Sequence, residues 1–401
     1  MKEELFQLAK ERMLSFGVDD GACQLSRMNG QYGLAKMLWT QEKIGEEKTA
    51  CFISTPDETI TRNTKRFVAG VSYGGAYMWG SDNDKIVFPD IYVNSCGMLT
   101  AGIQEKPELN NLLEKLSELF KKESYIGEYK LNWDLWKSNH FLDIFKVTKK
   151  DPEFSFPYDY ALVIHMGCSE LASLKHKGLA INANWESMED QDIKVFETPW
   201  GKWPTLLGEK AVNYLELAQY ANDFADERRK ILVEALFEKE EMKICYNAPH
   251  QSLRTMNKAY LGAHDLKDAK KGEAIPFMLN AEETCYLFEE RENIKIDLLD
   301  SKMQERVLEQ GMEKQLGSLN FLPHGGGYAF GEKMWPEKVI SSPNGTRLFS
   351  MKIKKSNAEF LISQARELPF FYRGKEVYDK TVELELGKPV VDLFPELVIK
   401  L

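Results

Sequence analysis

The sequence contains no apolar run near the roughly 18 residues that a membrane-spanning helix needs. Its first segment, MKEELFQLAKERMLSFGVDD, also lacks the apolar centre and the small-residue cleavage site of a signal peptide. Charged and apolar residues alternate there in a way that is typical of an amphipathic helix. We therefore expect no membrane association and a cytoplasmic location.

Cysteine and basic charge are both in short supply. Six cysteines in 401 residues are too few for a disulfide framework, so we expect reduced thiols. A formal net charge of −10 excludes general electrostatic binding to nucleic acid, and an RNA partner would need a local basic patch. The candidates, each of which could equally be a solvated face, are Lys175 with Lys177, Arg228-Arg229-Lys230, Lys267 with Lys270-Lys271, and Lys352 with Lys354-Lys355.

No zinc-finger spacing, Walker loop, dinucleotide fingerprint, nucleophile elbow, internal repeat or low-complexity tract is present. With 43% hydrophobic and 28% charged residues, the composition is that of a folded globular protein. Helical and strand-like segments alternate irregularly, which favours an α+β fold with packed β-sheets flanked by helices. We find no domain boundary and predict one large domain over residues 1–401, with 1–50 a less certain N-terminal extension.

Apolar periodicity predicts helices over residues 107–122, 211–238 and 299–310, the first with Pro107 at its first helical position. Short apolar runs predict strands over 85–89, 161–165, 242–246 and 284–288. Residues 181–204, which hold three tryptophans and two prolines, are predicted to form a long ordered loop.

Three histidines and one cysteine stand in settings typical of ligands. His140 follows a polar turn, His165 ends an apolar run, and Cys96 precedes a glycine in a polar turn. Thiolate and imidazole together suit zinc, manganese, cobalt or iron better than magnesium or calcium. These residues are therefore candidate ligands of a divalent transition metal, although each ring could also be a satisfied core histidine. His324 precedes three glycines, Gly325, Gly326 and Gly327, where the backbone is open enough for a phosphate to approach.

Taken in order along the chain, these segments resemble the motifs of the RtcB-type RNA ligases. Residues 94–98 (NSCGM) resemble the family's aspartate-containing turn ending in Cys-Gly-Met, 138–141 (SNHF) its Gly-Asn-His-Phe, and 165–169 (HMGCS) its His-x-Gly-Ser-Arg. Residues 246–247 (YN) stand where the family has His-Asn, 261–263 (LGA) where it has Arg-Lys-Gly-Ala, and 275–284 where it has Ile-Pro-Gly-Ser-Met-Gly. Residues 324–328 (HGGGY) resemble its His-Gly-Ala-Gly-Arg, so the resemblance runs from about residue 50 to the C-terminus.

The resemblance implies a ligase of tRNA processing and RNA repair that joins a 3′-phosphate or cyclic-phosphate RNA end to a 5′-hydroxyl end, using GTP and manganese. His324 matches the histidine that takes up a covalent guanylate. Cys96, His140 and His165 match metal ligands, and Asn139 and Asn247 match residues near the nucleotide phosphates, together with Gly325, Gly326 and Gly327.

Several positions depart from the family pattern. Val93 or Asn94 replaces a metal-binding aspartate and Tyr246 replaces a histidine, so we expect one ion rather than two, with His250 as a further candidate ligand. The basic residues expected to bind phosphate are replaced by Ser169, by Tyr260-Leu261 and by Tyr328, and Arg228-Arg229 could supply part of the missing charge. Two alternatives stay open: a non-catalytic binder of RNA ends or nucleotides, and a single-metal phosphoesterase.

Overall fold

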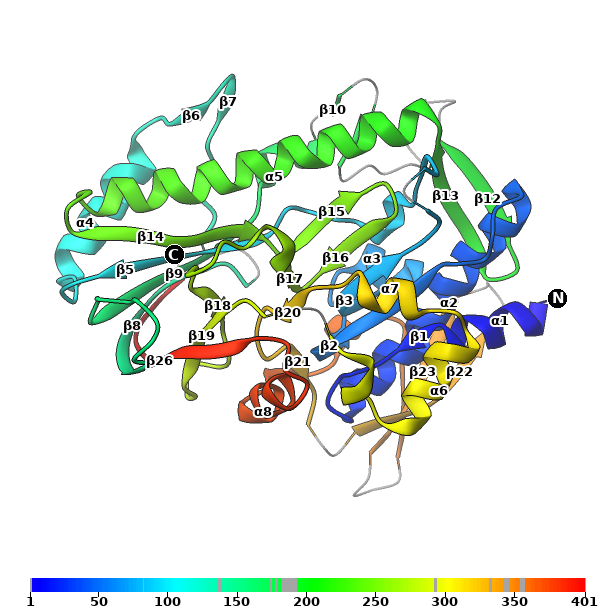
Figure 1. The fold of residues 1–401 in the computed structure, drawn as a ribbon. Helices are drawn as coiled ribbons and strands as arrows, with labels where there is room; N and C mark the ends of the chain where they lie inside the picture. Colours follow the sequence, from blue (N-terminus) through cyan, green and yellow to red (C-terminus); the bar gives the residue numbers. More distant parts are fainter. Residues whose placement is uncertain are drawn as a thin grey trace.

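Two large β-sheets form the frame of the protein, seen here in a computed structural model that describes residues 2–81, 83–135, 139–173, 175–176, 179–181, 193–291, 294–331, 334–341, 346–353 and 358–400 (Figure 1). The seven-stranded sheet is antiparallel throughout and has the order β14 (Met242–Pro249), β5 (Gly97–Ile103), β9 (Tyr160–Met166), β8 (Phe141–Lys150), β26 (Lys388–Ile399), β19 (Cys285–Glu289), β18 (Ile275–Phe277). The five-stranded sheet has the order β1 (Met13–Leu14), β2 (Cys51–Ile60), β3 (Ser72–Met78), β16 (Lys258–Leu261), β15 (Gln251–Thr255). The fold is mixed α+β with packed sheets, as predicted.

Helices cover both sheets. The 28-residue α5 (Glu209–Leu236) runs along β14, β5 and β15, and α2 (Gly21–Ile44) packs on β2 and β3 (Figure 1). The other helices are α1 (Lys2–Glu11), α3 (Thr64–Ala69), α4 (Leu109–Lys121), α6 (Ser301–Glu309), α7 (Glu313–Gly317) and α8 (Lys375–Glu383). Among the described residues, no helix combines the length and the apolar character needed to cross a bilayer.

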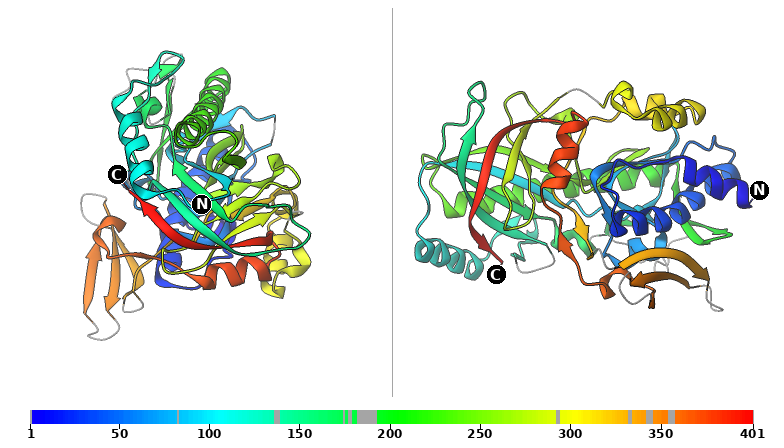
Figure 2. Two further views of the ribbon diagram at one scale, coloured as in Figure 1. Left: turned by 90° about the vertical axis from the view of Figure 1, so that its left-hand side faces the viewer. Right: turned by 90° about the horizontal axis from the view of Figure 1, so that it is seen from below.

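Smaller β-sheets accompany the two large ones. Two have three strands, β12 (Lys194–Thr198), β13 (Gly201–Leu207) and β4 (Ile86–Val87) in one, and β22 (Met334–Ser341), β23 (Arg347–Ile353) and β24 (Glu359–Ile362) in the other. Figure 2 shows the second of these at the edge of the molecule. Two-stranded pairs are β17 (Ala263–Asp265) with β20 (Phe321–Pro323), β21 (Tyr328–Ala329) with β25 (Phe371–Tyr372), β6 (Tyr125–Ile126) with β7 (Tyr129–Lys130), and β10 (Lys175–His176) with β11 (Leu179–Ala180).

The predicted helices are present as α4, α5 and α6, and the predicted strands as β4, β9, β14 and β19, with shifted ends. Pro107 was expected inside the first of these helices, which is wrong, because α4 begins at Leu109 after the N-cap Glu108, whose carboxylate accepts from the Asn111 amide. The buried helix α2 was not predicted. Asp20 caps its start, and it ends at Gly45 in the left-handed conformation, with φ 81°.

The predicted loop over 181–204 is wrong for its described part, because β12 and β13 form an antiparallel hairpin there. Residues 182–192 lie outside the described residues. Prolines suggested a loop, yet Pro199 lies in the turn and Pro204 is accommodated within β13 opposite Val195. Phe196 of β12 pairs with the fully buried Trp203 of β13, and this aromatic pair stabilises the hairpin.

Candidate metal centre and active site

Three neighbouring strands of the seven-stranded sheet bring Cys96, His140 and His165 to one edge. Cys96 immediately precedes β5, His140 immediately precedes β8, and His165 is the penultimate residue of β9. Because both neighbours are antiparallel to β9, the starts of β5 and β8 lie beside its end, with His165 opposite Met98 and Phe141. Ligand-type side chains far apart in sequence therefore meet at a single sheet edge.

His250 joins them from the connection between the two large sheets. It lies between β14 and β15, and its backbone N–H donates to the Cys96 carbonyl at 2.8 Å, as does that of Gln251 at 3.1 Å. The His250 carbonyl accepts from Gly262 at 2.8 Å. These bonds hold the His250 backbone against that of Cys96, which explains why a residue four positions after Tyr246 points into the site.

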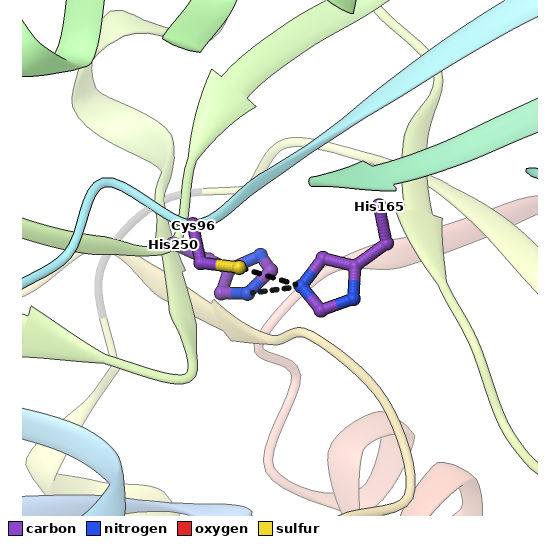
Figure 3. Close-up of side chains that lie close together, drawn as sticks. All are labelled: Cys96, His165 and His250. Atoms are coloured by element: carbon purple, nitrogen blue, oxygen red, sulfur yellow. Dashed lines mark hydrogen bonds between the residues drawn. The ribbon is translucent and has the colours of Figure 1, made fainter. Parts of the chain in front are cut away.

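Cys96, His165 and His250 form a group that could hold a metal ion (Figure 3). The Cys96 sulfur lies 3.2 Å from His165 Nε2, which in turn lies 3.2 Å from His250 Nε2. Ligand atoms around one tetrahedral ion are roughly 3.3–3.6 Å apart, given metal–ligand bonds of about 2.0–2.3 Å. All three side chains are buried, so the donor set and its spacing suit a divalent transition metal.

In both His165 and His140, the contacts of Nδ1 determine that Nε2 is the nitrogen facing the site. His165 Nδ1 donates to the Asn139 carbonyl at 2.9 Å, and His140 Nδ1 lies 3.3 Å from the Asp134 carbonyl and 3.4 Å from its carboxylate. Both rings therefore turn Nε2 towards Cys96, at 3.2 Å for His165 and 3.6 Å for His140. His140 lies beside the three-residue group rather than within it.

Electrostatics favour the ligand forms of Cys96 and His250. Burial alone would raise the pKa of Cys96, but His165 and His140 outweigh burial and hold that pKa well below the usual thiol value. Burial, together with nearby His324 and His165, holds the pKa of His250 well below its usual value, so its imidazole is neutral. Burial opposes a charge on His140, yet hydrogen bonds to Asp134 and Cys96 raise its pKa to about 10.

His324 stands next to this group and is oriented by a carboxylate that we had not predicted. Its Nδ1 lies 2.7 Å from Asp57 Oδ2, and its ring centroid lies 4.7 Å from that of His250. Asp57 belongs to β2, where the register breaks between Ser54 and Thr59 around Pro56. The break takes Asp57 out of the ladder, and its other oxygen accepts from the Thr55 hydroxyl at 2.5 Å. Among the described residues, His324 Nε2 has no hydrogen-bond partner.

The three glycines after His324 are needed for protein packing. A Cβ at Gly325 would lie 2.0 Å from the Met278 carbonyl, and one at Gly326 would lie 2.2 Å from that of Arg373. Gly327 has φ 66°, and a Cβ there would lie 2.4 Å from the Asp57 carbonyl. The sequence analysis explained these glycines by a backbone that is open to a phosphate. The structure explains them by close packing against neighbouring carbonyl groups, and all three glycines also line a cavity beside His324.

That cavity has a volume of about 150 Å³ and a mainly apolar wall. His165, His324 and Asn139 line it near the metal group, and Asp143 and Lys400 also line it. Asp143 is buried, and its Oδ1 has no hydrogen-bond partner among the described residues. Burial raises the pKa of Asp143 to about 7. Such a carboxyl group in an apolar cavity is a ready acceptor for a ligand's N–H groups.

Asn247 and the arginine pair lie elsewhere. Asn247 lines a different cavity, where its side chain accepts from Arg229 Nε at 2.7 Å and donates to the Asp226 carbonyl at 2.8 Å. Arg228 and Arg229 are fully buried on α5, so they are not a surface patch. Arg228 donates to the Gly167 carbonyl at 2.7 Å and to Asp134 at 2.6 Å, which supports the end of β9 and the partner of His140.

The positions that depart from the ligase pattern have structural roles here. Asn94 accepts from the Cys96 amide at 3.2 Å and shapes the turn, while Val93 is buried. The Tyr246 hydroxyl donates to His264 Nδ1 at 3.0 Å, and His264 Nε2 donates to the Pro276 carbonyl at 3.1 Å. Burial lowers the pKa of His264 to about 3, so this ring is neutral and fully hydrogen-bonded.

Three acidic residues, Asp57, Asp134 and Asp143, were missed by the sequence analysis. A weak signal existed for Asp57, since two adjacent carboxylates interrupt the otherwise uncharged segment CFISTPDETI. Asp134 lies six residues before His140, and Asp143 lies three residues after it. These spacings match no regular sequence pattern, so neither residue was predicted.

No protein-family model matches this sequence, and no curated protein matches it either.

Proposed function

We propose that this protein is a metal-dependent nucleotidyltransferase of the RNA-ligase type, in which His324 takes a guanylate from GTP and passes it to an RNA end that is then joined. The observation that carries the proposal is the His324–Asp57 pair, at 2.7 Å, directly beside the Cys96–His165–His250 group. The order of the sequence motifs that resemble RtcB-type RNA ligases supports the same assignment.

The nucleophile is His324 Nε2, because Nδ1 is engaged with Asp57. Its attack on the α-phosphorus of GTP forms a P–N bond and breaks the P–O bond to pyrophosphate, which leaves. The ring then carries positive charge, which the Asp57 carboxylate offsets at 2.7 Å. A divalent ion such as manganese, bound by Cys96, His165 and His250, would offset charge on the phosphoryl oxygens.

Guanine fits the cavity beside His324 better than adenine does. Asp143 Oδ1 has no hydrogen-bond partner among the described residues, and the ionised carboxylate can accept from the adjacent N1–H and N2 amino group of guanine, whereas adenine places a ring acceptor at the matching position. Phe141, Phe145 and Met98 supply an apolar wall for a planar ring. An apolar cavity of about 150 Å³ is large enough for an aromatic ring.

The deciding experiment is incubation with manganese and GTP labelled at its α-phosphorus, followed by denaturing electrophoresis. We expect a protein-bound, acid-labile label that is absent in His324→Ala. Lys230→Gln is the control that should keep the label, because the Lys230 side chain is 44% exposed on α5 and pairs with Glu227. A blank from wild-type protein across several metals would defeat the proposal.

A hydrolytic function is the second candidate, because three buried protein ligands leave room for a metal-bound water. It predicts metal-dependent cleavage of small phosphoesters without GTP, and that cleavage would persist in His324→Ala. RNA or GTP binding without either activity would instead favour a non-catalytic binding protein.

A further inference from the structure

A second and larger cavity adjoins the metal centre and holds three arginines that the sequence analysis did not single out. Its volume is about 540 Å³, and Cys96, His140 and Asn139 form its inner end. Asn139 also lines the His324 cavity, so the two cavities meet at this residue. Arg62 and Arg66 lie in the wall, with Arg366 at the rim. In a chain with a net charge of −10, this concentration of positive charge is a local feature.

Arg66 is buried and held rigidly. It is 4% exposed, its Nε and Nη2 donate to the Tyr92 carbonyl, and its Nη2 also donates to Gln251 Oε1 at 2.6 Å. Both partners are neutral, and among the described residues no carboxylate forms an ion pair with Arg66. A buried guanidinium that no carboxylate among the described residues pairs with is poised to accept an anion.

Arg62 is held by stacking rather than by an acid. Its guanidinium carbon lies 3.5 Å from the ring centroid of Phe370 and 5.7 Å from that of Tyr328. Its Nε is buried and has no hydrogen-bond partner in the described part of the chain. Stacking uses the face of the guanidinium and leaves the N–H edge for a bidentate contact with phosphate. Tyr328, which stands where the ligase pattern has an arginine, thus contacts an arginine from another segment of the chain.

The carboxylate that lines this cavity is already paired with cationic side chains. Asp134 is the one carboxylate among the described lining residues, and it lies 2.6 Å from Arg228 and 3.4 Å from His140. Arg366 is exposed and donates to the Thr64 hydroxyl, which leaves its remaining N–H groups towards the rim. The cavity therefore selects an anion, and its volume exceeds that of a lone phosphate.

We propose that this cavity binds the terminal phosphate of an RNA strand, with Arg62 and Arg66 on that phosphate and Arg366 on the adjoining backbone phosphate. The inference rests on the proposed function, since it places the second substrate at the same metal centre. It also accounts for phosphate recognition in a chain that has Ser169, Leu261 and Tyr328 where the ligase pattern has basic residues.

The test measures binding of a short fluorescent RNA, with either a 3′-phosphate or a 3′-hydroxyl end, to the full chain without GTP. We expect wild-type protein to prefer the phosphorylated RNA. Arg62→Gln should weaken binding of that RNA about tenfold, leave the hydroxyl-ended RNA nearly unchanged, and reduce the salt dependence by roughly one phosphate contact. Arg366→Gln, at an exposed position, should weaken both RNAs by a similar, smaller factor.

Arg291→Gln is the matched control, because Arg291 is 44% exposed and pairs with Glu385 at 3.8 Å, outside the cavity. Circular dichroism verifies that each variant is folded. Equal losses for both RNAs in Arg62→Gln, or no loss, would overturn the inference, as would displacement of phosphorylated RNA by GTP. Guanylate labelling of wild-type protein is measured separately, so a failure of the proposed function and a failure of this RNA site give different results.

Discussion

On the proposed assignment, Asp57 determines which nitrogen of His324 reacts, because a carboxylate 2.7 Å from Nδ1 keeps the proton on that side of the ring. Asp57→Asn keeps the shape but removes the charge. We expect the rate of guanylate labelling to fall about 10²- to 10⁴-fold, the range typical of lost charge stabilisation next to a nucleophile.

Glu58 offers a matched control for this change, since it is equally buried but faces Arg27 and Cys23 instead of His324. Glu58→Gln should keep labelling at a level close to wild type in protein that is folded. Equal losses in both variants would mean that Asp57 supports only the fold of β2.

Asp143 makes stability depend on pH. Its folded pKa is about 7, against 3.8 for an exposed aspartate, so between these values the folded state holds a proton that the unfolded state has lost. The stability contribution of this group is full below about pH 4 and is lost as pH rises towards 7. Asp143→Asn stays neutral, so it should stabilise the protein relative to wild type by on the order of 1–4 kcal/mol at pH 8 and little at pH 4.

Urea unfolding at the two pH values checks this expectation. Asp159→Asn is the control, because that side chain is 78% exposed and should change stability only slightly. The same Asp143→Asn protein should lose its preference for GTP over ATP in the labelling assay. If Asp143→Asn changed the free energy of unfolding by the same amount at both pH values, the raised pKa of Asp143 would be contradicted.

Sequence patterns indicated some site residues and not others for a physical reason. Cys96 and His165 are marked by local settings, a glycine turn and a strand end, that can be recognised without the fold. Asp57 and His324 are 267 residues apart, and their contact depends on the break in β2, which no local pattern encodes. Arg62 escaped notice because nothing in its neighbourhood shows that Phe370 will stack on it.

At the scale of elements, α5 is the support on which the metal-side strands rest. Arg228, fully buried in this helix, donates to carbonyls of Asn132 and Gly167 and to the Asp134 carboxylate. Replacement by methionine would remove the positive charge that Arg228 places beside the buried carboxylates of Asp134 and Glu170, at a cost of about 3–5 kcal/mol. We also expect metal affinity to fall about 10- to 100-fold, because His140 and the end of β9 lose their support.

Lys230, two residues further along α5, supplies the comparison. It is 44% exposed and lies 3.6 Å from Glu227, so Lys230→Gln should change the free energy of unfolding by no more than about 0.5 kcal/mol. Denaturant unfolding and calorimetric metal titration measure both variants. If Arg228→Met matched Lys230→Gln, the supporting role of α5 would be refuted.

Elements were predictable where one pattern dominated. The stripe of leucines in α4 and the long amphipathic repeat of α5 specify helices whatever they pack against. The prolines of the β12–β13 hairpin led to the wrong prediction of a loop. The aromatic pair Phe196–Trp203 could not correct it, because this contact exists only once the hairpin has formed. Helix α2 has buried residues on all sides, so it lacks the amphipathic signature that revealed the others.

For the whole molecule, the metal group joins segments that are distant in sequence. His165 lies on the seven-stranded sheet, Cys96 directly precedes a strand of that sheet, and His250 lies where the chain passes to the five-stranded sheet. An ion that binds only the folded chain stabilises it by about 2.7 kcal/mol at a hundredfold excess over its dissociation constant. Zinc, manganese or cobalt should therefore raise the melting temperature by a few degrees, and magnesium should not.

Thermal melts with and without a chelator measure this shift, and Cys96→Ser should abolish most of it. Cys51→Ser is the control, because Cys51 is also fully buried but belongs to a different part of the core. A magnesium response as large as that of zinc would argue against thiolate and imidazole ligands.

Each of the two cavities is lined by an exposed basic residue that the other lacks, Lys400 for the cavity beside His324 and Arg366 for the arginine cavity. A nucleotide and a polynucleotide would therefore reach the centre by independent routes, and neither would trap the other. On the proposed assignments, pyrophosphate can depart while the second molecule is already seated. Initial-rate measurements should then show no compulsory order of addition, which would let the enzyme be charged in advance or while its target is already bound.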